Sequence, residues 1–151
     1  MKKDKVLKIV TFLVLTIFVL SMGVMSFAKQ IEPDHINWDY LHTCGYVFEE
    51  SEDDYGVFIC GGSTTVGSQR YAVVLVELLQ LNFVDNEISW DTYYSFGEED
   101  YASALVEEEV EVEPGYTYRL RITHQVKDMS GDLLEEYVHY SVMKVITGTN
   151  N

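Results

Sequence analysis

The side chains best suited to acid–base chemistry are a histidine and a glutamate in the last third of the chain. His124 and Glu136 flank a glycine-containing turn at 127–132, and a two-residue period on both sides predicts antiparallel strands there. The expected register places His124 across from Glu136, where a carboxylate beside an imidazole suits proton transfer or metal binding. We favour a structural hydrogen bond, because a buried imidazole needs a partner whatever its role.

Two arginines on the polar face of the same strand are candidates for anion binding. Arg119 and Arg121 have planar guanidinium groups that match a carboxylate or a phosphate. The expected strand pairing sets Glu109 against Arg119 and Glu107 against Arg121, so we interpret both arginines as already paired. His139, expected across from Arg121, is interpreted as an exposed histidine.

Aromatic side chains are the main candidates for a contact surface. Trp90 and Tyr93 lie in an alternating segment that is interpreted as a partly exposed strand. Such rings present a large flat face together with a polar tip, which suits contact with a protein or with a sugar ring.

The sequence contains no positive signal for a metal, a cofactor or catalysis. The acidic runs at 49–54 and 98–100 lack the alternating ligand pattern of a calcium loop, so we interpret them as solvated turns, with calcium binding as the open alternative. The glycine-rich segment 61–65 lacks the lysine of a phosphate loop. Catalytic zinc needs three ligands, and His35 and His42 lie in an irregular lead-in and a first strand. We therefore expect no metal, no cofactor and no catalytic residue.

The only two cysteines lie in two short strand-like segments. Segments 41–49 and 55–61 flank an acidic turn, and the expected hairpin register places Cys44 opposite Cys60. Outside the cytosol such a pair is typically bonded. We therefore predict a disulfide that stabilises the fold by about 3 kcal/mol.

The rest of the chain is predicted to be all-β. Apolar segment 71–84 favours a strand buried on both faces over a helix, because valines are frequent in it. The strongest alternation is at 106–112 and 116–126, which we predict to be hairpin partners, with Val110 opposite Tyr118 and Val112 opposite Tyr116. Further strands are expected at 88–96, with a break at 97–100, and at 133–147. Six to seven strands in a single domain at 41–151, after an irregular lead-in at 29–40, indicate an antiparallel β-sandwich or a partly open barrel.

Residues 1–28 are typical of a secretory signal peptide. Four lysines and one aspartate lie within the first eight residues, and an apolar run follows that ends in Ser26-Phe27-Ala28. We therefore predict cleavage after Ala28. The alternative is an uncleaved membrane anchor. Cleavage would change the net charge from −15 to −18. Such acidity argues against nucleic acid and anionic polymers as partners, and no stable membrane insertion is expected after processing.

One set of motifs resembles a family of short exported proteins of Gram-positive bacteria. The residues concerned are Gly62-Ser63-Thr64, Leu79-Gln80, Trp90, Gly115-Tyr116-Thr117-Tyr118-Arg119, His124 and Glu136. The resemblance covers most of the chain after residue 55 and implies export and a β-sandwich-like fold, with no catalytic residue. More distantly, the layout is similar to lactococcin-type bacteriocins.

These observations predict a secreted, non-enzymatic binding domain with an unknown protein or carbohydrate ligand. The weak candidate binding residues are Arg119, Arg121, His124, Glu136, Trp90 and Tyr93. A bacteriocin-like secreted toxin is one alternative, although strong acidity counts against binding to anionic envelopes. A hydrolase that uses His124 and an acid is a second alternative.

Overall fold

The computed structural model describes residues 29–30, 39–85 and 87–146. All regular secondary structure within these ranges is β-strand. The predicted signal peptide and its cleavage site lie outside the described residues. The part of the chain that is described contains no helix of the length and apolarity needed to cross a membrane.

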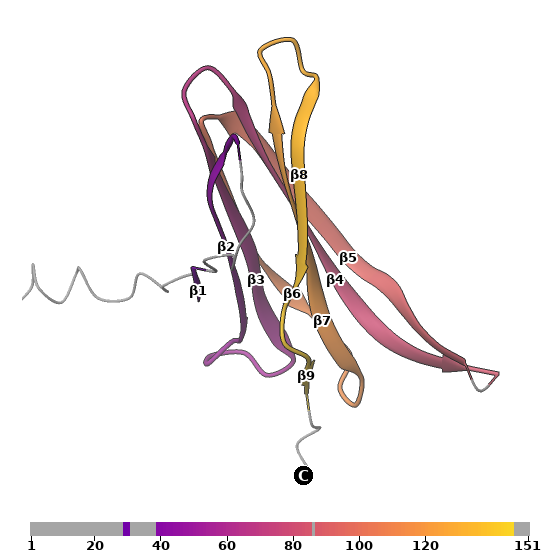
Figure 1. Cartoon of the computed structure of the whole chain (residues 1–151). Helices are drawn as coiled ribbons and strands as arrows, with labels where there is room; N and C mark the ends of the chain where they lie inside the picture. The colour runs from indigo at the N-terminus through magenta and orange to yellow at the C-terminus, as the bar shows by residue number, and fades with distance from the viewer. Residues whose placement is uncertain (1–28, 31–38, 86, 147–151) are drawn as a thin grey trace, which may run out of the picture.

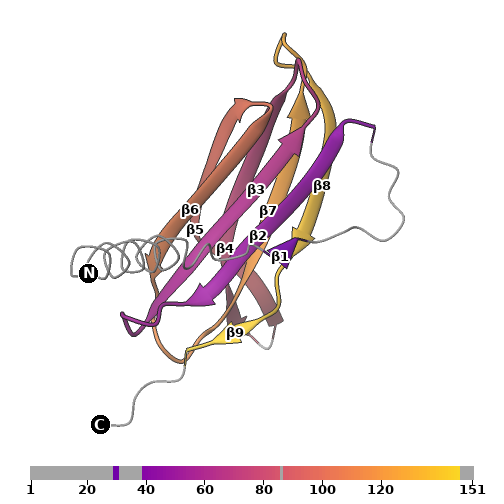
Figure 2. The same ribbon diagram turned by 90° about the vertical axis from the view of Figure 1, so that its left-hand side faces the viewer.

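Two antiparallel sheets pack face to face without closing into a barrel, which confirms the predicted β-sandwich (Figures 1 and 2). The first sheet has the order β1 (Lys29–Gln30), β2 (Leu41–Glu50), β3 (Val57–Val66) and β6 (Ser103–Glu111). The second sheet has the order β5 (Glu87–Tyr101), β4 (Tyr71–Val84), β7 (Thr117–Lys127) and β8 (Leu133–Tyr140), and β9 (Lys144–Val145) pairs with β7. Lys29 and Gln30 begin the lead-in that we expected to be irregular, yet they pair with β2.

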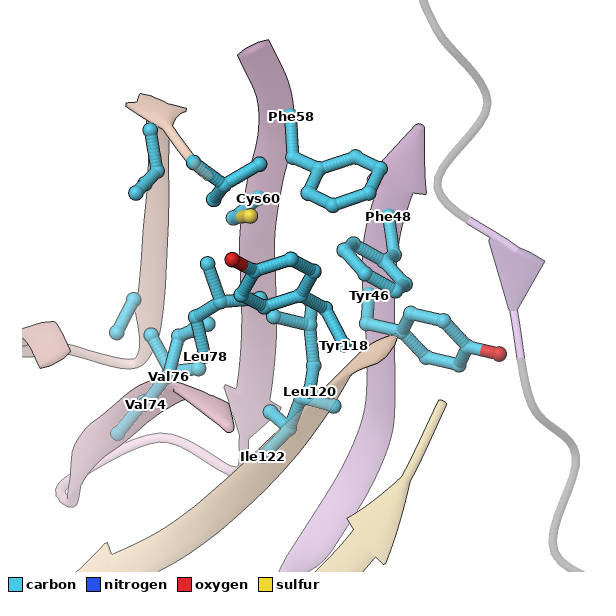
Figure 3. Close-up of a cluster of buried hydrophobic side chains, with 14 of the residues drawn as sticks. Tyr46, Phe48, Phe58, Cys60, Val74, Val76, Leu78, Tyr118, Leu120 and Ile122 are labelled. Atoms are coloured by element: carbon cyan, nitrogen blue, oxygen red, sulfur yellow. The ribbon is translucent and has the colours of Figure 1, made fainter. Parts of the chain in front are cut away.

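The core lies between the two sheets and follows the alternation in the sequence. Every second side chain of β7 from Tyr118 to Val126 is buried, and Val110 of β6 is buried on the facing side. The Tyr118 ring meets the ring of Phe58 with 5.8 Å between centroids, and Phe58 meets Phe48 at 4.8 Å (Figure 3). Apolar burial of this kind is the main driving force for the fold. The β4 side chains that complete this cluster are Val74, Val76 and Leu78.

A glycine in β3 lets the two sheets approach closely. A Cβ atom added to Gly62 would lie 2.7 Å from Cγ2 of Val74 and 3.1 Å from Cγ2 of Val76, both in the facing sheet. Such distances are too short for two carbon atoms that are not bonded to each other. The glycine-rich segment at 61–65 therefore serves the packing of the core as part of β3.

The predicted hairpin of β2 and β3 is confirmed, but its register differs by four residues. Cys44 lies opposite Thr64, and Cys60 lies opposite Phe48. Both thiols are free and buried, so the predicted disulfide is wrong. Two cysteines that are four positions apart in a ladder do not meet, because each residue advances a strand by about 3.3 Å.

The turn explains this difference in register. The acidic Glu50 still pairs in the ladder, opposite Phe58, so the strands extend further into the charged stretch than expected. The turn then closes at Gly56, whose φ of 81° lies in the left-handed region that glycine adopts without strain. Charged side chains at the exposed end of a strand remain in water, and their polarity therefore does not stop strand pairing.

Strands β6 and β7 do not form the predicted hairpin. The strand β6 pairs with β3 in the first sheet, whereas β7 pairs with β4 and β8 in the second (Figure 2). Their apolar faces point inward as predicted but meet across the core. The predicted pairs that are wrong for this reason are Val110 with Tyr118, Val112 with Tyr116, Glu109 with Arg119 and Glu107 with Arg121. Alternation determines which face is buried, and it does not determine whether two such strands lie side by side or face to face.

The apolar segment 71–84 is the strand β4, as predicted, between β5 and β7. Its burial on both faces is only partial, because Val73 and Leu79 are buried on the outer face whereas Leu75 between them is exposed. The predicted break at 97–100 is wrong: β5 continues to Tyr101, and Gly97 pairs with Leu75.

Side-chain hydrogen bonds join the two sheets along both open sides of the sandwich. On one side, a carboxylate oxygen of Glu135 in β8 accepts hydrogen bonds from the backbone N–H groups of Tyr40 at 3.0 Å and Leu41 at 2.9 Å, where β2 begins. On the other side, the hydroxyl of Tyr94 in β5 donates to Glu108 of β6 at 2.9 Å. Figure 2 shows β2 beside β8 and β5 beside β6.

Candidate functional site

A bulge at the start of β8 decides which of its side chains enter the sandwich. Lys127 pairs with Leu133 in the predicted register, and the register then shifts by one residue. As a result Glu136 pairs with Gln125 on the outer face and accepts a hydrogen bond of 2.7 Å from its side chain. The predicted pairing of His124 with Glu136 is therefore wrong, because a shift of one residue reverses the face of every side chain in a strand.

The same shift brings a second histidine to His124. His139, expected to be exposed across from Arg121, is buried and lies opposite Ile122. The two imidazole rings stack at 15° with 5.0 Å between centroids, and Nε2 of His124 is 3.3 Å from Nδ1 of His139. Burial, with a smaller contribution from His139, lowers the pKa of His124 to about 3; burial lowers the pKa of His139 to about 4. Both rings are therefore neutral near pH 7.

Hydrogen bonds determine where His124 carries its proton. The hydroxyl of Thr64 donates its single hydrogen to the carbonyl oxygen of Val73 at 3.0 Å. Its oxygen is also 2.7 Å from Nδ1 of His124, so Nδ1 must be the donor of that second bond. The lone pair of neutral His124 is therefore on Nε2 and points toward His139. The Nε2 atom of His139 is itself buried and has no hydrogen-bond partner among the described residues.

Cys44 joins the two histidines from the opposite sheet. Its Sγ atom and one ring nitrogen of each histidine lie within 4.8 Å of one another, and all three side chains are buried. We name Cys44, His124 and His139 the inter-sheet cluster, since they come from β2, β7 and β8. Burial raises the pKa of the Cys44 thiol to about 11, so the free thiol is protonated near neutral pH. The ring of Tyr46 lies beside the cluster, 5.2 Å from that of His139.

The cluster was not predicted from the sequence, for identifiable reasons. The sequence pattern predicted a disulfide for Cys44 and a surface position for His139, and these two assignments left too few ligands for zinc. The alternation did place His124 on the inward face of its strand. The bulge in β8 and the shifted turn between β2 and β3 were both needed to complete the group, and neither has a clear signal in the sequence.

The outer face of the second sheet carries a groove of about 750 Å³, which we call the outer groove. Arg121 lines it and forms an ion pair with Glu77 of the neighbouring strand β4, with 2.5 Å between Nε and the carboxylate oxygen. The partner of Arg121 is thus Glu77 and not the predicted Glu107. The lining residues are Leu75, Val76, Glu77, Ser95, Phe96, Arg121, Thr123, Gln125, Glu136, Val138 and Tyr140.

Arg119 lies beside the outer groove, two residues before Arg121 on the same face. Its guanidinium group is held between two aromatic rings, 4.0 Å from the centroid of Trp90 and 4.4 Å from that of Tyr140. Cation–π contacts of this kind orient the rings as well as the cation. Four of the predicted binding residues, Arg119, Arg121, Trp90 and Glu136, therefore lie on the outer face of one sheet.

The other two predicted binding residues lie elsewhere. His124 belongs to the inter-sheet cluster. Tyr93 lies on the β5–β6 side of the sandwich, where its ring is 5.6 Å from that of Tyr118 and its hydroxyl donates to the carbonyl of Glu111 at 3.4 Å. Tyr93 is thus not part of the outer groove.

The acidic runs are only partly turns. In the first run, Glu49 and Glu50 end the strand β2, and the exposed residues after them form the turn. In the second run, residues 98–100 belong to β5, where Glu99 forms an ion pair with Lys127 of β7. The interpretation of both runs as turns is therefore wrong for the second.

Neither a family model, nor a curated protein, nor a solved structure matches this chain. Functional inference therefore depends on the geometry of the outer groove and of the inter-sheet cluster.

Proposed function

We propose that this protein is an exported, non-enzymatic binding domain that holds a neutral carbohydrate in the outer groove. The observation that carries the proposal is the position of a half-exposed ring, Tyr140, in the same groove as the ion pair of Arg121 and Glu77. This arrangement combines a flat apolar surface with oriented donors and acceptors.

The chemistry of a sugar ring matches such a groove. A pyranose has an apolar face of C–H groups and a rim of hydroxyls that both donate and accept hydrogen bonds. Tyr140 offers an aromatic face for the first, and the side chains of Arg121, Gln125 and Glu136 offer donors and acceptors for the second.

The aromatic part of the outer groove is held in place before any ligand arrives. Tyr140 packs on the guanidinium group of Arg119, which in turn packs on Trp90. Arg121 is likewise held by Glu77. Side chains that are already ordered lose less conformational entropy when they bind a ligand, and this favours binding.

The N-terminal segment and the net charge support export and a neutral ligand. The basic start and apolar run of residues 1–28 are typical of a signal peptide, and the resemblance to exported proteins of Gram-positive bacteria points the same way. A mature chain with a net charge of −18 repels anionic cell-wall polymers at long range. Neutral sugars are free of this repulsion.

The test is a glycan-binding measurement on protein secreted into the medium by a Gram-positive host that expresses the full chain. We expect binding to at least one neutral oligosaccharide on an array, followed by calorimetry. Tyr140→Ala should weaken binding at least about tenfold, because an anchoring ring typically contributes more than 1 kcal/mol. The matched control is Tyr116→Ala, since Tyr116 is a similarly exposed tyrosine in the loop between β6 and β7.

Three results would contradict the proposal. The first is retention of the chain inside the cell, which would remove the exported role. The second is an array with no bound neutral sugar. The third is equal loss of binding in the Tyr140 and Tyr116 variants, which would place the ligand outside the groove.

A further inference from the structure

We infer that the inter-sheet cluster of Cys44, His124 and His139 binds one metal ion of the zinc type and that this ion links the two sheets from inside. The cluster lies in the interior of the sandwich, whereas the outer groove lies on the far face of the second sheet. The inference therefore does not depend on the proposed function.

The donor set selects the class of metal. One thiolate and two imidazoles suit Zn²⁺ and similar borderline ions. Calcium and magnesium bind through oxygen atoms, and the cluster supplies nitrogen and sulfur. The ligands come from β2 in one sheet and from β7 and β8 in the other.

The spacing of the nitrogen atoms fits a tetrahedral ion. Two nitrogens that each lie about 2.0–2.1 Å from zinc are about 3.3 Å apart at the tetrahedral angle. Nε2 of His124 and Nδ1 of His139 are 3.3 Å apart. A tetrahedral ion places sulfur and nitrogen ligands about 3.6 Å apart. The three ligand atoms lie within 4.8 Å of one another, so coordination requires the Cys44 sulfur to move closer by about 1.2 Å at most.

The hydrogen bonds of His124 prepare it as a ligand. Metal-bound histidines usually donate the other ring N–H to a nearby acceptor, which fixes the ring. Nδ1 of His124 donates to Thr64, whose hydroxyl is itself held by the carbonyl of Val73. The lone pair of His124 is thereby directed from Nε2 into the cluster, where it faces Nδ1 of His139.

His139 is also held in the interior beside His124. Its Nε2 atom is buried without a hydrogen-bond partner within the described ranges, in a side chain that is 8 % exposed. A buried polar atom without a partner costs about 1–3 kcal/mol. Nε2 is not the nitrogen that faces His124, so this cost shows only that the fold holds the His139 ring in the interior, where its Nδ1 lies against the lone pair of His124.

The binding step releases one proton. The Cys44 thiol gives up its hydrogen to solvent when its sulfur bonds to the ion. His124 binds as the tautomer it already has, whereas the hydrogen on Nδ1 of His139 moves to Nε2 of the same ring so that Nδ1 can bond to the ion, and both rings stay neutral. No fourth His, Cys, Asp or Glu side chain joins the group among the described residues. The fourth tetrahedral position therefore has no side-chain ligand of these types among the described residues.

The first experiment is a cobalt titration of the purified product of the full-length gene, from whichever cell fraction contains it, after treatment with a chelator. The absorption spectrum of bound Co²⁺ depends on the type and the geometry of its ligands. We expect one equivalent to produce a thiolate-to-cobalt charge-transfer band together with the strong visible bands of a tetrahedral ion, and one equivalent of Zn²⁺ to remove both. A weak octahedral spectrum, or no charge-transfer band, would overturn the inference.

Variants locate the site. Cys44→Ser should abolish the charge-transfer band, whereas Cys60→Ala, which alters the other buried cysteine, should keep it. Thr64→Val should weaken Co²⁺ binding about 10- to 100-fold, because it removes only the partner that orients His124. Loss of the band in Cys60→Ala and not in Cys44→Ser would contradict the proposed ligands.

A measurement on the unaltered protein tests the same site without requiring any variant to fold. Zn²⁺ should slow the alkylation of Cys44 and leave the rate at Cys60 unchanged, as read by mass mapping of the two peptides. Equal rates at Cys44 with and without Zn²⁺ would overturn the inference.

Discussion

Nε2 of His124 lies 3.3 Å from Nδ1 of His139, although the two residues are 15 positions apart and on different strands. The contact exists because a bulge in β8 turns His139 inward. It creates a polar region at the β2–β8 side of an otherwise apolar interior. That region is where the first sheet contributes Cys44.

The stability of the metal-free protein should fall in mild acid. Both histidines have an ordinary pKa of 6.5 when unfolded, and folding lowers it to about 3 for His124 and about 4 for His139. Between pH 6.5 and pH 4 the unfolded chain binds more protons. The free energy of unfolding should therefore decrease as pH falls through this window, by about 1.4 kcal/mol per pH unit for each histidine. The side chains of Cys44, Tyr46 and Tyr137 pack against the pair.

Urea unfolding at a series of pH values, with a chelator present, measures this effect. His139→Asn should remove about half of the dependence on pH. His42→Asn is the control, because His42 is exposed on β2 and should leave the dependence unchanged. The prediction would be contradicted if the free energy of unfolding of the original protein and that of His139→Asn changed equally with pH.

Glu135 should be needed to hold β2 against β8. Its carboxylate accepts hydrogen bonds from the backbone of Tyr40 and Leu41, and the loss of hydrogen bonds to a charged group costs about 1.5–3 kcal/mol. We expect Glu135→Gln to reduce the free energy of unfolding by about this amount. The control is Glu136→Gln, which changes the next residue along the strand. Glu136 is exposed, so this variant should alter the free energy of unfolding by less than about 0.5 kcal/mol. Equal effects in denaturant melts would argue against this link.

Gly62→Ala should destabilise the fold by overpacking. The added methyl group meets the side chains of Val74 and Val76 in the opposite sheet, and such overpacking typically costs 1–3 kcal/mol. Gly67→Ala is the matched control, because the nearest atom to its added Cβ, at 3.2 Å, is at the far end of the long Arg70 side chain and not in a packed core. Thermal unfolding should show a lower Tm for the Gly62 variant alone; an unchanged Tm would mean that the sheets are further apart.

Both cysteines should be found as free thiols in the folded protein. Cys44 and Cys60 are in different ladder positions, and burial raises the pKa of Cys60 to about 12, with a small opposing effect of Lys144. We expect slow alkylation of the native protein and complete alkylation of both residues after unfolding without reductant. A cross-linked pair of peptides in the mass map would restore the predicted disulfide.

Several features of the fold were predictable because they depend on local alternation. The inward face of β7 from Tyr118 to Val126 was predicted, and each of its side chains is buried. The segment 71–84 was correctly interpreted as a strand, because branched side chains favour extended backbone. The candidate site was less predictable: Arg119 and Arg121 share the outer face, whereas His124 and Glu136 lie on opposite faces of their sheet.

The amino-acid sequence by itself determined the all-β class and the buried face of most strands, since neighbouring side chains in a strand point to opposite sides. Only the tertiary structure decided which strands pair and in which register. A turn that closes at Gly56 and a bulge at Leu134 each shift a ladder without changing the alternation beside it. Their positions depend on packing between sheets, and that packing brings Cys44, His124 and His139 together.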